Sequence, residues 1–396
     1  MPPQLPPQQP EDDPAIVLDG FDGLKNTIGL TALGPRDLAE AINIDIDDRG
    51  KVYRRRGYTK VVSGSYGSLY NGEDGRVYGV SNGVLGIINP NYSFTALSSQ
   101  NGGYDYFFAV LPLETQPDAG GLTIGTEPLT YTQVGASIYF SNSIASGIID
   151  TVGLQLLPWG STPDIFLSPV VNPTATLPAV AGKLIGKPPL ATSLGYYNGR
   201  IYLAQGPTLW YTELYLYNYV DKTKTFYQFE GDITMVGVVG DGIYVGTDEG
   251  CWFLAGPAAP LKRTRVLDSP VIPGSMVYIP AELANPPQIG TQPDTPLQVS
   301  IAFQTANGFC VGKDSGEAYN LTEAKFMFPN VVRSASLYRR QDGVNQYIAV
   351  NDSGGSPVNS ARFGDFIDAE IIRGNASWQA LGETALFTDT FTADLL

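Results

Sequence analysis

The 396-residue sequence contains no histidine, and that absence removes several kinds of chemistry at once. Histidine is the usual general acid–base group at neutral pH, the base of Ser-His-Asp and Cys-His arrangements, and the commonest metal ligand. Only two cysteines are present, Cys251 and Cys310, each in an apolar, strand-like stretch. The ligand count excludes a zinc site of the usual kind, and two small buried hydrophobic residues are favoured over a disulfide.

Charged residues are also scarce, and one sign dominates. Asp, Glu, Lys and Arg make up 16% of the chain, and 24 basic residues face 39 acidic ones, for a net charge of −15. Binding to DNA or RNA requires basic residues that displace counterions from phosphates, so we do not expect nucleic-acid binding to be the main function. Two interpretations stay open: an acidic wall that DNA passes without sticking, and acidity that serves solubility alone.

Long apolar runs are missing as well. No stretch approaches the roughly 18 apolar residues of a membrane span, so we expect no membrane-spanning segment. The N-terminal "MPPQLPPQQPEDDP" lacks the basic and apolar regions of a secretory signal, and we expect the protein to be made and kept in a soluble compartment. This Pro/Gln-rich tail, residues 1–14, is biased toward polyproline geometry. It is consistent both with disorder and with a strap that orders on a neighbouring subunit.

The residues that are abundant indicate strands and tight turns. The chain holds 45 Gly, 30 Pro and 23 Tyr, whereas the Ala-, Glu- and Lys-rich composition of helical proteins is absent. Many turn formers and aromatics with little charge predict a mostly β protein. The length exceeds that of a usual compact domain, but a single propeller or barrel can reach it.

A loose hairpin pattern recurs along the chain. Each copy has a Gly-initiated apolar strand, a polar turn rich in Gly, Asp or Asn, and a second apolar strand. Copies cover 75–88, 136–150, 199–212, 241–256 and 307–322, with a degenerate copy at 342–355. Their markers recur at irregular intervals of roughly 40 to 65 residues and are Tyr78, Tyr139, Tyr202, Tyr244, Cys310 and Tyr347.

The pattern predicts an all-β fold, a β-propeller of five to seven irregular blades with the hairpins as inner strands. One four-stranded blade cannot cover both of its faces, whereas blades packed around an axis can. The irregular intervals imply insertions, which we place in the Pro/Thr-rich stretches 110–130, 160–190 and 280–298. A pair of β-sandwiches is the alternative, and the recurrent Gly-x-Ile-Tyr start favours the propeller.

The chain is expected to divide into four parts. They are the tail 1–14, an extended N-terminal strand and hairpin segment 15–62, the propeller core with insertions 63–360, and a C-terminal segment 361–396 that closes the propeller or contacts a neighbour.

The second part has two local patterns. Residues 35–41, with Pro35 early, predict one or two helical turns. Alternation of Ile with Asn or Asp over 42–47 then predicts a half-buried strand. A turn at 48–50 and a returning strand from Lys51 to Arg54 complete the expected hairpin.

The acidic stretch that begins at Asp45 superficially matches a calcium loop. An EF-hand loop needs an oxygen ligand at its fifth position and Glu at its twelfth. Those positions are Arg49 and Arg56, whose charges repel the ion, so we expect no calcium site. The arginines 54–56 are flanked by acidic residues, and an intersubunit salt-bridge surface is favoured over a phosphate contact.

Carboxylates in the hairpin turns raise the question of catalysis. Asp241 and the pair Asp248–Glu249 lie in Gly-rich turns. Paired carboxylates serve glycosidases, but acidic residues are frequent in turns through backbone preference alone. No phosphate-binding Gly loop, nucleophile elbow or redox Cys pair is found. We therefore predict that the protein is not an enzyme and has no catalytic, cofactor-binding or metal-binding residues and no cofactor.

The segment 209–229, "LWYTELYLYNYVDKTKTFYQF", is dense in aromatic residues. It could line a carbohydrate groove. A segment of this kind more often supplies the strands of a blade and a packing surface for a partner, and we favour that interpretation.

Several stretches resemble a group of tailed-phage virion proteins. The segment "FDGLKNTIGL" and the following "DLAEAINIDIDDRGKVYRRRGYTKV" match their opening, which contains A-x-N-x-D-x-D-x-x-G-x-x-x-x-R-x-G-Y. "GRIYLAQGPTLWYTELYLYNYVD", "FEGDITMVGVVGDGIYVGTDEGCWFLAG" and "GFCVGKDSGEAYNLTEAKFMFP" resemble later parts of the same group. The matching stretches run in the same order from residue 21 to 329, and this order carries more weight than any single motif.

The resemblance implies a virion structural protein built on a β-propeller, similar to the tail nozzle (tail tubular) proteins of short-tailed phages. In that family a hexameric ring below the portal and adaptor retains DNA and lets it pass during ejection, and no catalytic residues belong to it. The implied partners are copies of this chain, portal, adaptor and other tail proteins, and passing DNA without sequence-specific binding. The implied location is the phage tail, after synthesis in the host cytoplasm.

Two alternatives accompany this interpretation. Several nozzle proteins are considerably longer and carry platform domains, so a head–tail connector or another tail propeller fits as well. A receptor- or glycan-binding propeller at a tail tip is the first alternative function, and a carbohydrate-active propeller enzyme is the second.

Overall fold

The computed structural model describes residues 20–40, 44–46, 51–54, 61, 66–99, 124–125, 127–160, 165–166, 184–279, 300–323, 325–328, 330–341 and 344–352. Within them every regular element is a strand apart from one 3-10 turn, η1 (Leu30–Ala32). No helix in this part of the chain has the length and apolarity needed to cross a membrane. The predicted all-β class is confirmed.

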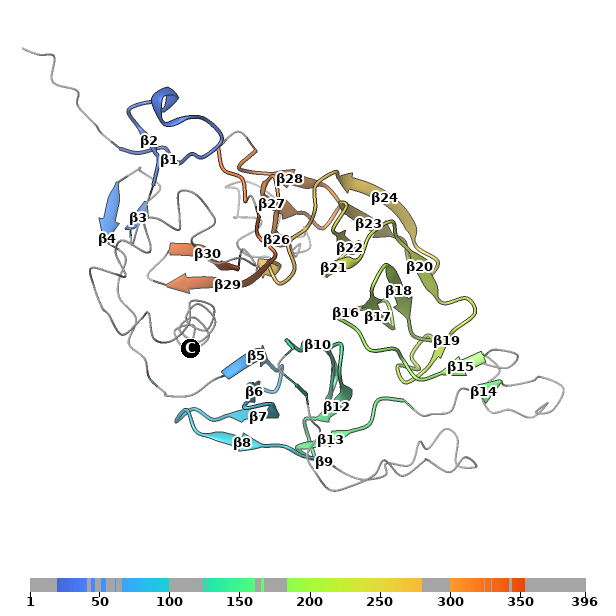
Figure 1. Cartoon of the computed structure of the whole chain (residues 1–396). Coiled ribbons are helices and arrows are strands. Elements are labelled where there is room, and N and C mark those ends of the chain that lie inside the picture. Colours follow the sequence, from blue (N-terminus) through green and yellow to red (C-terminus); the bar gives the residue numbers. More distant parts are fainter. Residues whose placement is uncertain are drawn as a thin grey trace, which may run out of the picture.

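Five blades of four antiparallel strands, each in chain order, lie around a ring as a β-propeller (Figure 1). The first blade is β5 (Tyr66–Asn71), β6 (Val77–Ser81), β7 (Val84–Ile88) and β8 (Phe94–Ala96). The second is β10 (Thr130–Val134), β11 (Ser137–Ser141), β12 (Ser146–Asp150) and β13 (Gln155–Leu157), with β9 (Ser98–Ser99) parallel to β13. The third is β16 (Ser193–Tyr197), β17 (Arg200–Gln205), β18 (Thr208–Tyr211) and β20 (Phe226–Gln228).

Two further blades complete this series. The fourth is β21 (Ile233–Val239), β22 (Gly242–Thr247), β23 (Cys251–Ala255) and β24 (Lys262–Leu267). The fifth is β25 (Val277–Ile279), β26 (Ser300–Thr305), β27 (Gly308–Gly312) and β28 (Ala318–Asn320). A two-stranded sheet, β29 (Arg333–Gln341) with β30 (Val344–Asp352), lies between the fifth and first blades (Figure 1).

Smaller sheets lie at the periphery. A three-stranded sheet combines β14 (Ile165–Phe166), β15 (Leu184–Gly186) and β19 (Val220–Asp221). Near the N-terminus, β1 (Gly23–Leu24) pairs with β2 (Asp37–Leu38), and β3 (Ile44–Ile46) pairs with β4 (Val52–Arg54).

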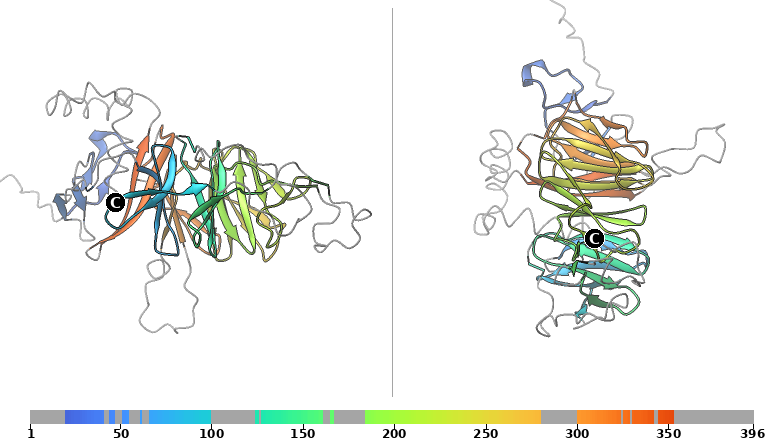
Figure 2. Two further views of the ribbon diagram at one scale, coloured as in Figure 1. Left: turned by 90° about the horizontal axis from the view of Figure 1, so that it is seen from below. Right: turned by 90° about the vertical axis from the view of Figure 1, so that its right-hand side faces the viewer.

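The blades stand face to face, as the two side views show (Figure 2), and apolar side chains fill the space between them. Each of the four buried clusters draws on two consecutive blades, from the first and second to the fourth and fifth. Strands β22 and β26 are buried along their whole length, because they have a neighbouring sheet on both faces. This arrangement is the propeller core that the sequence predicts.

The predicted hairpins exist, but their place in the blades is different. In the first four blades they are the second and third strands, not the inner ones. The copy at 307–322 is one strand later still, because β27 begins with Gly308 and so imitates the start of the earlier copies. The residue of the fifth blade that corresponds to Tyr244 is therefore Ala302 on β26, and the marker Cys310 was out of phase.

Two other local predictions were wrong. The copy at 342–355 was expected to be a hairpin, but β30 runs without a break and pairs with the preceding β29. The segment 35–41 was expected to be helical, but it contains β2, which pairs in parallel with β1. The carboxylate of Asp37 accepts hydrogen bonds from the backbone of Gly34 (3.1 Å) and from Lys25 (3.3 Å), which ties the segment to its neighbours and not into a helical turn.

The predicted returning strand is confirmed by β4, and the central residues of the preceding strand by β3. The turn at 48–50, the tail 1–14 and the segment 361–396 lie outside the described residues. Most of the predicted insertions 110–130, 160–190 and 280–298 lie there too.

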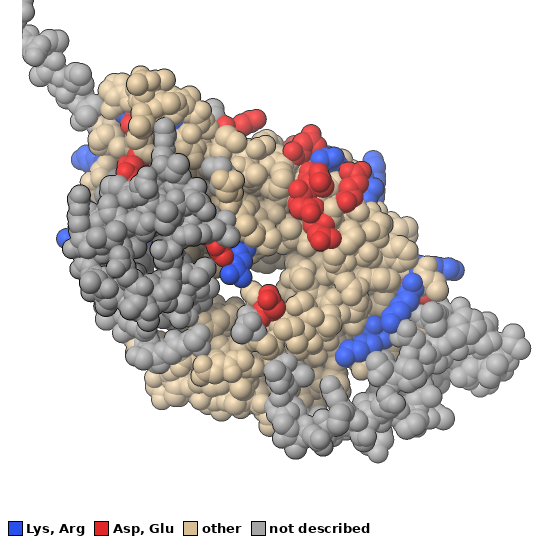
Figure 3. All heavy atoms as spheres, viewed as in Figure 1, with Lys and Arg blue, Asp and Glu red and all other residues tan. Residues whose placement is uncertain are grey.

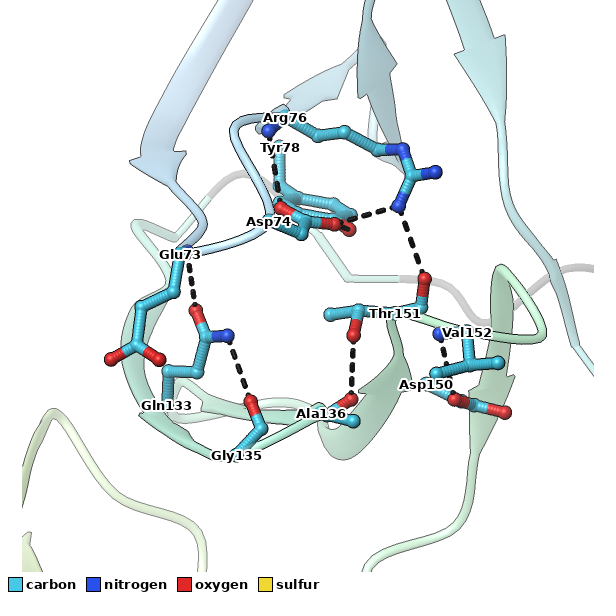
Figure 4. A network of polar contacts seen from close by, with 10 residues as sticks. All are labelled: Glu73, Asp74, Arg76, Tyr78, Gln133, Gly135, Ala136, Asp150, Thr151 and Val152. Carbon is cyan, nitrogen blue, oxygen red and sulfur yellow. Dashed lines mark hydrogen bonds and ion pairs between the residues drawn. The ribbon is translucent and has the colours of Figure 1, made fainter.

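A polar network joins the ends of the first and second blades (Figure 4). Asp74 accepts hydrogen bonds from Tyr78 Oη (2.7 Å) and Arg76 Nη1 (2.8 Å), and the same Nη1 donates to the carbonyl of Thr151 (3.1 Å). Burial raises the pKa of Asp74, but the hydrogen bonds from Tyr78 and Arg76 outweigh it and leave that pKa below its usual value. Burial and the bond to Asp74 raise the pKa of Tyr78 to about 12.

The ring is completed by contacts between distant parts of the chain. Asn26 Nδ2 donates a hydrogen bond to the carbonyl of Met327 (2.8 Å), and Asn26 Oδ1 accepts one from the Met327 amide (2.9 Å). The side-chain amide thus pairs with the backbone of Met327 as a residue on a neighbouring strand would. At the next sheet, Tyr347 Oη donates to the carbonyl of Ser275 (2.6 Å), and its ring packs on Phe309 at 4.6 Å. The N-terminal segment and β30 are thereby anchored to the fifth blade and the loop that follows it.

Candidate functional site

A groove with a volume of about 520 Å³ lies at one end of the third and fourth blades. Its lining comes from the turn between β16 and β17, the long loop after β18, and the loop between β23 and β24. The residues that line it are Tyr196, Asn198, Gly199, Arg200, Leu214, Tyr215, Pro257, Ala258 and Ala259.

An Asn-Gly turn forms one wall of the groove. Asn198 and Gly199 have φ values of 45° and 74°, the left-handed pair that a two-residue hairpin turn requires. A side chain at position 199 would meet the ring of Tyr215 at 2.8 Å and Leu214 Cδ1 at 2.9 Å. Glycine is therefore required at this position for two reasons: the positive φ of the turn, and the close approach of two large side chains.

Tyr215 is exposed and at the same time fixed in position. Its side chain is 68% exposed, and its neighbour Leu214 is 48% exposed. The backbone amide of Tyr215 donates to the carbonyl of Gly199 (2.8 Å), and its φ of 57° is unusual for a large residue. Strained backbone that holds an exposed aromatic ring is a feature of binding sites, because an ordered ring loses little entropy when a ligand covers it.

The opposite wall comes from the fourth blade. Asn198 Nδ2 donates to the carbonyl of Pro257 (3.2 Å), and Tyr197 Oη donates to the carbonyl of Gly256 (3.1 Å). The pKa of Tyr197 is raised, chiefly by burial. These bonds connect the turn of one blade to the loop of the next, so both walls of the groove are held by the same turn.

Arg200 supplies a positive charge to the groove. Its Nη1 donates to the carbonyl of Thr212 (2.5 Å), and its guanidinium lies 5.3 Å from the ring centre of the buried Tyr211. No carboxylate in the described part of the chain forms an ion pair with it. The groove therefore combines exposed aromatic surface with one cation, which suits a ligand that has both apolar and acidic parts.

The carboxylates considered for catalysis do not meet. Asp241 precedes β22 and Asp248 and Glu249 follow it, so they lie at opposite ends of a six-residue strand. A strand of that length spans about 20 Å, whereas glycosidase carboxylates lie about 5–10 Å apart. The described residues contain no group of three or more His, Cys, Asp or Glu side chains that could hold a metal ion.

Asp248 and Glu249 belong instead to an acidic surface at the end of the fourth blade (Figure 3). Arg265 lies within it, 2.6 Å from Asp268 and 3.9 Å from Glu230, and donates to the carbonyl of Glu249 (2.9 Å). The surface is at the end of the blade away from the groove, and its acidic residues are Glu230, Asp232, Asp248, Glu249 and Asp268. The composition shows that the chain is acidic, and this surface is one place where the acidic residues are concentrated.

The two cysteines are free and buried, as predicted. Both belong to the cluster between the fourth and fifth blades, where they pack with Tyr244 and Phe303. Burial raises the pKa of Cys310 to about 11 and raises that of Cys251 further, so both remain thiols at neutral pH.

The aromatic segment 209–229 supplies most of β18 and all of β20, which are strands of the third blade as predicted, and β19, which belongs to the peripheral three-stranded sheet. Most of its rings are buried or half-buried, whereas Tyr215 and Phe226 are exposed. Sequence reasoning did not find the groove, because its other walls come from 196–200 and 257–259. The Asn-Gly dipeptide before Arg200 was the one local signal, since it marks a tight turn that brings flanking loops together.

The stretch that imitates a calcium loop is described only in part. Asp45 lies on β3 opposite Tyr53 on β4. The other positions on which the calcium question depends, 47–50 and 55–56, lie outside the described residues, as do most of the arginines 54–56.

The solved structures to which the chain is similar match it at low identity. No family model and no curated protein matches the chain. BBS1N, solved in complex with ARL6DN, is 12% identical with a TM-score of 0.40, over 78% of this chain and 80% of that chain. Sqt1 of Saccharomyces cerevisiae is 8% identical with a TM-score of 0.32, over 66% and 62%.

The extracellular domain of BT4673 from B. thetaiotaomicron is 11% identical with a TM-score of 0.37 over 70% of this chain. The match covers 33% of that chain, so this protein spans about one third of its length. Similarities this distant carry no information about function.

Proposed function

We propose that the protein is a structural subunit of a phage tail, a nozzle or head–tail connector component that assembles into a ring through which DNA passes. The N-terminal stretch that resembles tailed-phage virion proteins folds as a two-stranded hairpin, β3–β4, and this observation carries the proposal. In the described part of the chain no third strand is added to this two-stranded sheet. Two-stranded hairpins are at best marginally stable in water, so this one needs a surface to pack on.

The exposed side of the hairpin is suited to a neighbouring subunit. All three residues of β4 are exposed, and they include Val52 at 37% and Tyr53 at 53%. An exposed aromatic next to an exposed branched aliphatic and Arg54 is the composition typical of subunit contacts. In the proposed ring, this hairpin contacts the next copy.

The net charge of −15 supports the second half of the proposal. A ring that DNA passes must not bind phosphates, and an acidic surface repels them. Portal, adaptor and other tail proteins are the proposed neighbours, and the mature virion is the proposed location.

Electron microscopy of the purified protein and of phage particles tests the proposal. We expect rings of identical subunits, at the end of the tail near the portal. A double variant, Val52→Ser with Tyr53→Ser, should shift the protein toward monomers in mass photometry, whereas Val84→Ser on the first blade should leave the assembly intact. A monomer at all concentrations, or a position at the far tip of the tail, would reject the ring function.

A further inference from the structure

The groove of the third and fourth blades has the features of a site for proline-rich peptides. Tyr215 is exposed on one wall, Tyr196 lines the same turn, and Pro257 stands opposite. Proline-rich segments bind to aromatic grooves of this kind because their extended helix is already formed and loses little entropy. The amide of Tyr215 donates to the carbonyl of Gly199, and Asn198 Nδ2 donates to the carbonyl of Pro257, so both walls are held before any ligand enters.

The chain carries a matching segment at its own N-terminus. The sequence "MPPQLPPQQPEDDP" contains two P-x-x-P units, Pro3 to Pro6 and Pro7 to Pro10. A polyproline helix has three residues per turn, so residues three apart lie on the same face. Each unit can therefore place two prolines against the same wall.

The charges match as well. Glu11, Asp12 and Asp13 follow the last proline of the second unit. Arg200 lies in the groove, where its guanidinium donates to the carbonyl of Thr212 and packs on the ring of Tyr211. A segment with prolines at one end and carboxylates at the other fits a groove with tyrosines and an arginine.

From this match we propose that residues 1–14 of one copy dock into the groove of a second copy. A neighbouring copy is the occupant because the described chain begins on the side of the ring opposite the groove. Figure 1 shows β1 and β2 across the ring from β16–β19, and residues 11–19, which join the prolines to the described chain, span at most about 30 Å. The contact deepens the proposed function, since it rests on the chain assembling with copies of itself.

Peptide binding tests the chemistry of the contact. The receptor is the full-length protein with its own tail weakened by four substitutions, Pro3→Ala, Pro6→Ala, Pro7→Ala and Pro10→Ala. The probe is a fluorescent peptide of residues 1–14, followed by anisotropy. We expect saturable binding that falls about tenfold or more in Tyr215→Ala.

Matched controls separate the groove from general stickiness. Tyr92→Ala removes another exposed tyrosine with positive φ, on the first blade, and should not change the affinity. A peptide with Glu11→Gln, Asp12→Asn and Asp13→Asn should bind more weakly and with less dependence on salt. A scrambled peptide without P-x-x-P units should not bind.

Cross-linking tests whether the partner is a second copy. One chain carries Gln4→Cys, with the new thiol activated as an aromatic mixed disulfide, and the other carries Ala258→Cys. Attack by the second thiolate forms the intermolecular disulfide and releases the aromatic thiol. Cys251 and Cys310 are buried, so they should not react with the activated disulfide. Val152→Cys, which replaces a side chain 81% exposed on the second blade, is the control acceptor and should react slowly.

Three outcomes would overturn the inference: no peptide binding, equal loss in Tyr215→Ala and Tyr92→Ala, or cross-linking only within one chain when both cysteines are present. Binding of a glycan, lost in Tyr215→Ala, without peptide binding would also reject it and favour a receptor-binding role. Rings that form without peptide binding would refute only this contact. Peptide binding by a chain that never forms rings would refute the ring function.

Discussion

The middle of the propeller and the place where the ring closes are stabilised in different ways. Between the third and fifth blades, whole strands such as β22 and β26 are buried, and the contacts are apolar. At the closure, β29 and β30 are largely half-exposed, and single polar groups such as Asn26 and Tyr347 make the connections. Apolar packing stabilises a strand along its whole length, whereas a hydrogen bond stabilises it at a single residue. We therefore expect the sheet of β29 and β30 to unfold locally before the third to fifth blades do.

The largest expected effect is a cavity in the middle. Phe303 is fully buried on β26 within the cluster that contains Tyr244 and both cysteines. Phe303→Ala should lower the free energy of unfolding by about 3–5 kcal/mol, measured by urea denaturation with circular dichroism. Tyr319→Ala, at a side chain 44% exposed on the same blade, is the control and should change it by less than about 0.5 kcal/mol. A loss below about 1 kcal/mol for Phe303→Ala would show that the blades are not packed as described.

The polar network between the first and second blades should respond next, and it should respond to pH. The folded-state pKa of Asp74 lies below its usual 3.8, so its contribution to stability is present above that value and is lost as the pH falls through the folded-state pKa. Asp74→Asn should cost about 1.5–3 kcal/mol at pH 7 and flatten the decline of stability between pH 4 and pH 2.

The matched control for that network is Asp150→Asn. Asp150 accepts one hydrogen bond, from the amide of Val152 (3.0 Å), and should cost less at pH 7 (Figure 4). Thermal melts over a pH series provide the measurement. A decline below pH 4 that is as steep in Asp74→Asn as in the parent protein would contradict the assigned role.

A smaller, local effect is expected at the sheet of β29 and β30. Tyr347→Phe removes the hydroxyl that donates to Ser275 and lies 2.9 Å from Ser336 Oγ. We expect a loss of about 1–2 kcal/mol, seen as faster hydrogen exchange in 333–352 with little change in the fourth blade. Tyr338→Phe is the control, because Tyr338 faces Tyr347 across the two strands and its hydroxyl makes no hydrogen bond to the described residues. Equal acceleration in all blades would mean that the closure and the middle unfold together.

The smallest effect is expected at the N-terminal segment. Asn26→Ala removes both bonds to Met327 and should accelerate hydrogen exchange in 20–40, with a loss of about 1 kcal/mol or less because the site is exposed. Asn26→Asp keeps an acceptor for the Met327 amide but loses the donor, so it should fall between the parent protein and Asn26→Ala. If the two variants behave alike, the paired bonding of this side chain does not matter in solution.

Sequence patterns predicted the propeller architecture, but they did not predict which strands of a blade each hairpin provides. Strand alternation and Gly-rich turns identify β-hairpins because those signals are local. They do not say which strand of a blade a hairpin provides, since that depends on contacts with the next sheet. The fifth blade shows the difficulty: Gly308 starts a strand that looks like the earlier second strands, but the second strand of this blade is β26, which has Ala302 in the place of Tyr244.

The candidate site was harder to predict for the same reason. The sequence directed attention to Tyr-rich 209–229 and to turn carboxylates. Only the fold brings Tyr215 to Gly199 and the loop at 257–259. The buried state of Cys251 and Cys310 was predictable, because it follows from their apolar surroundings in the chain.

The contact between Asn26 and Met327 also has a consequence for the order in which the protein is made. The two residues are 301 positions apart, so the N-terminal segment cannot find its partner until nearly the whole propeller has left the ribosome. At 5–20 residues per second, that wait lasts about 15–60 s. During that time the N-terminal segment lacks its partner at Met327, so this part of the ring closes last. Slower translation of the last blade would lengthen the time for which the ring stays open.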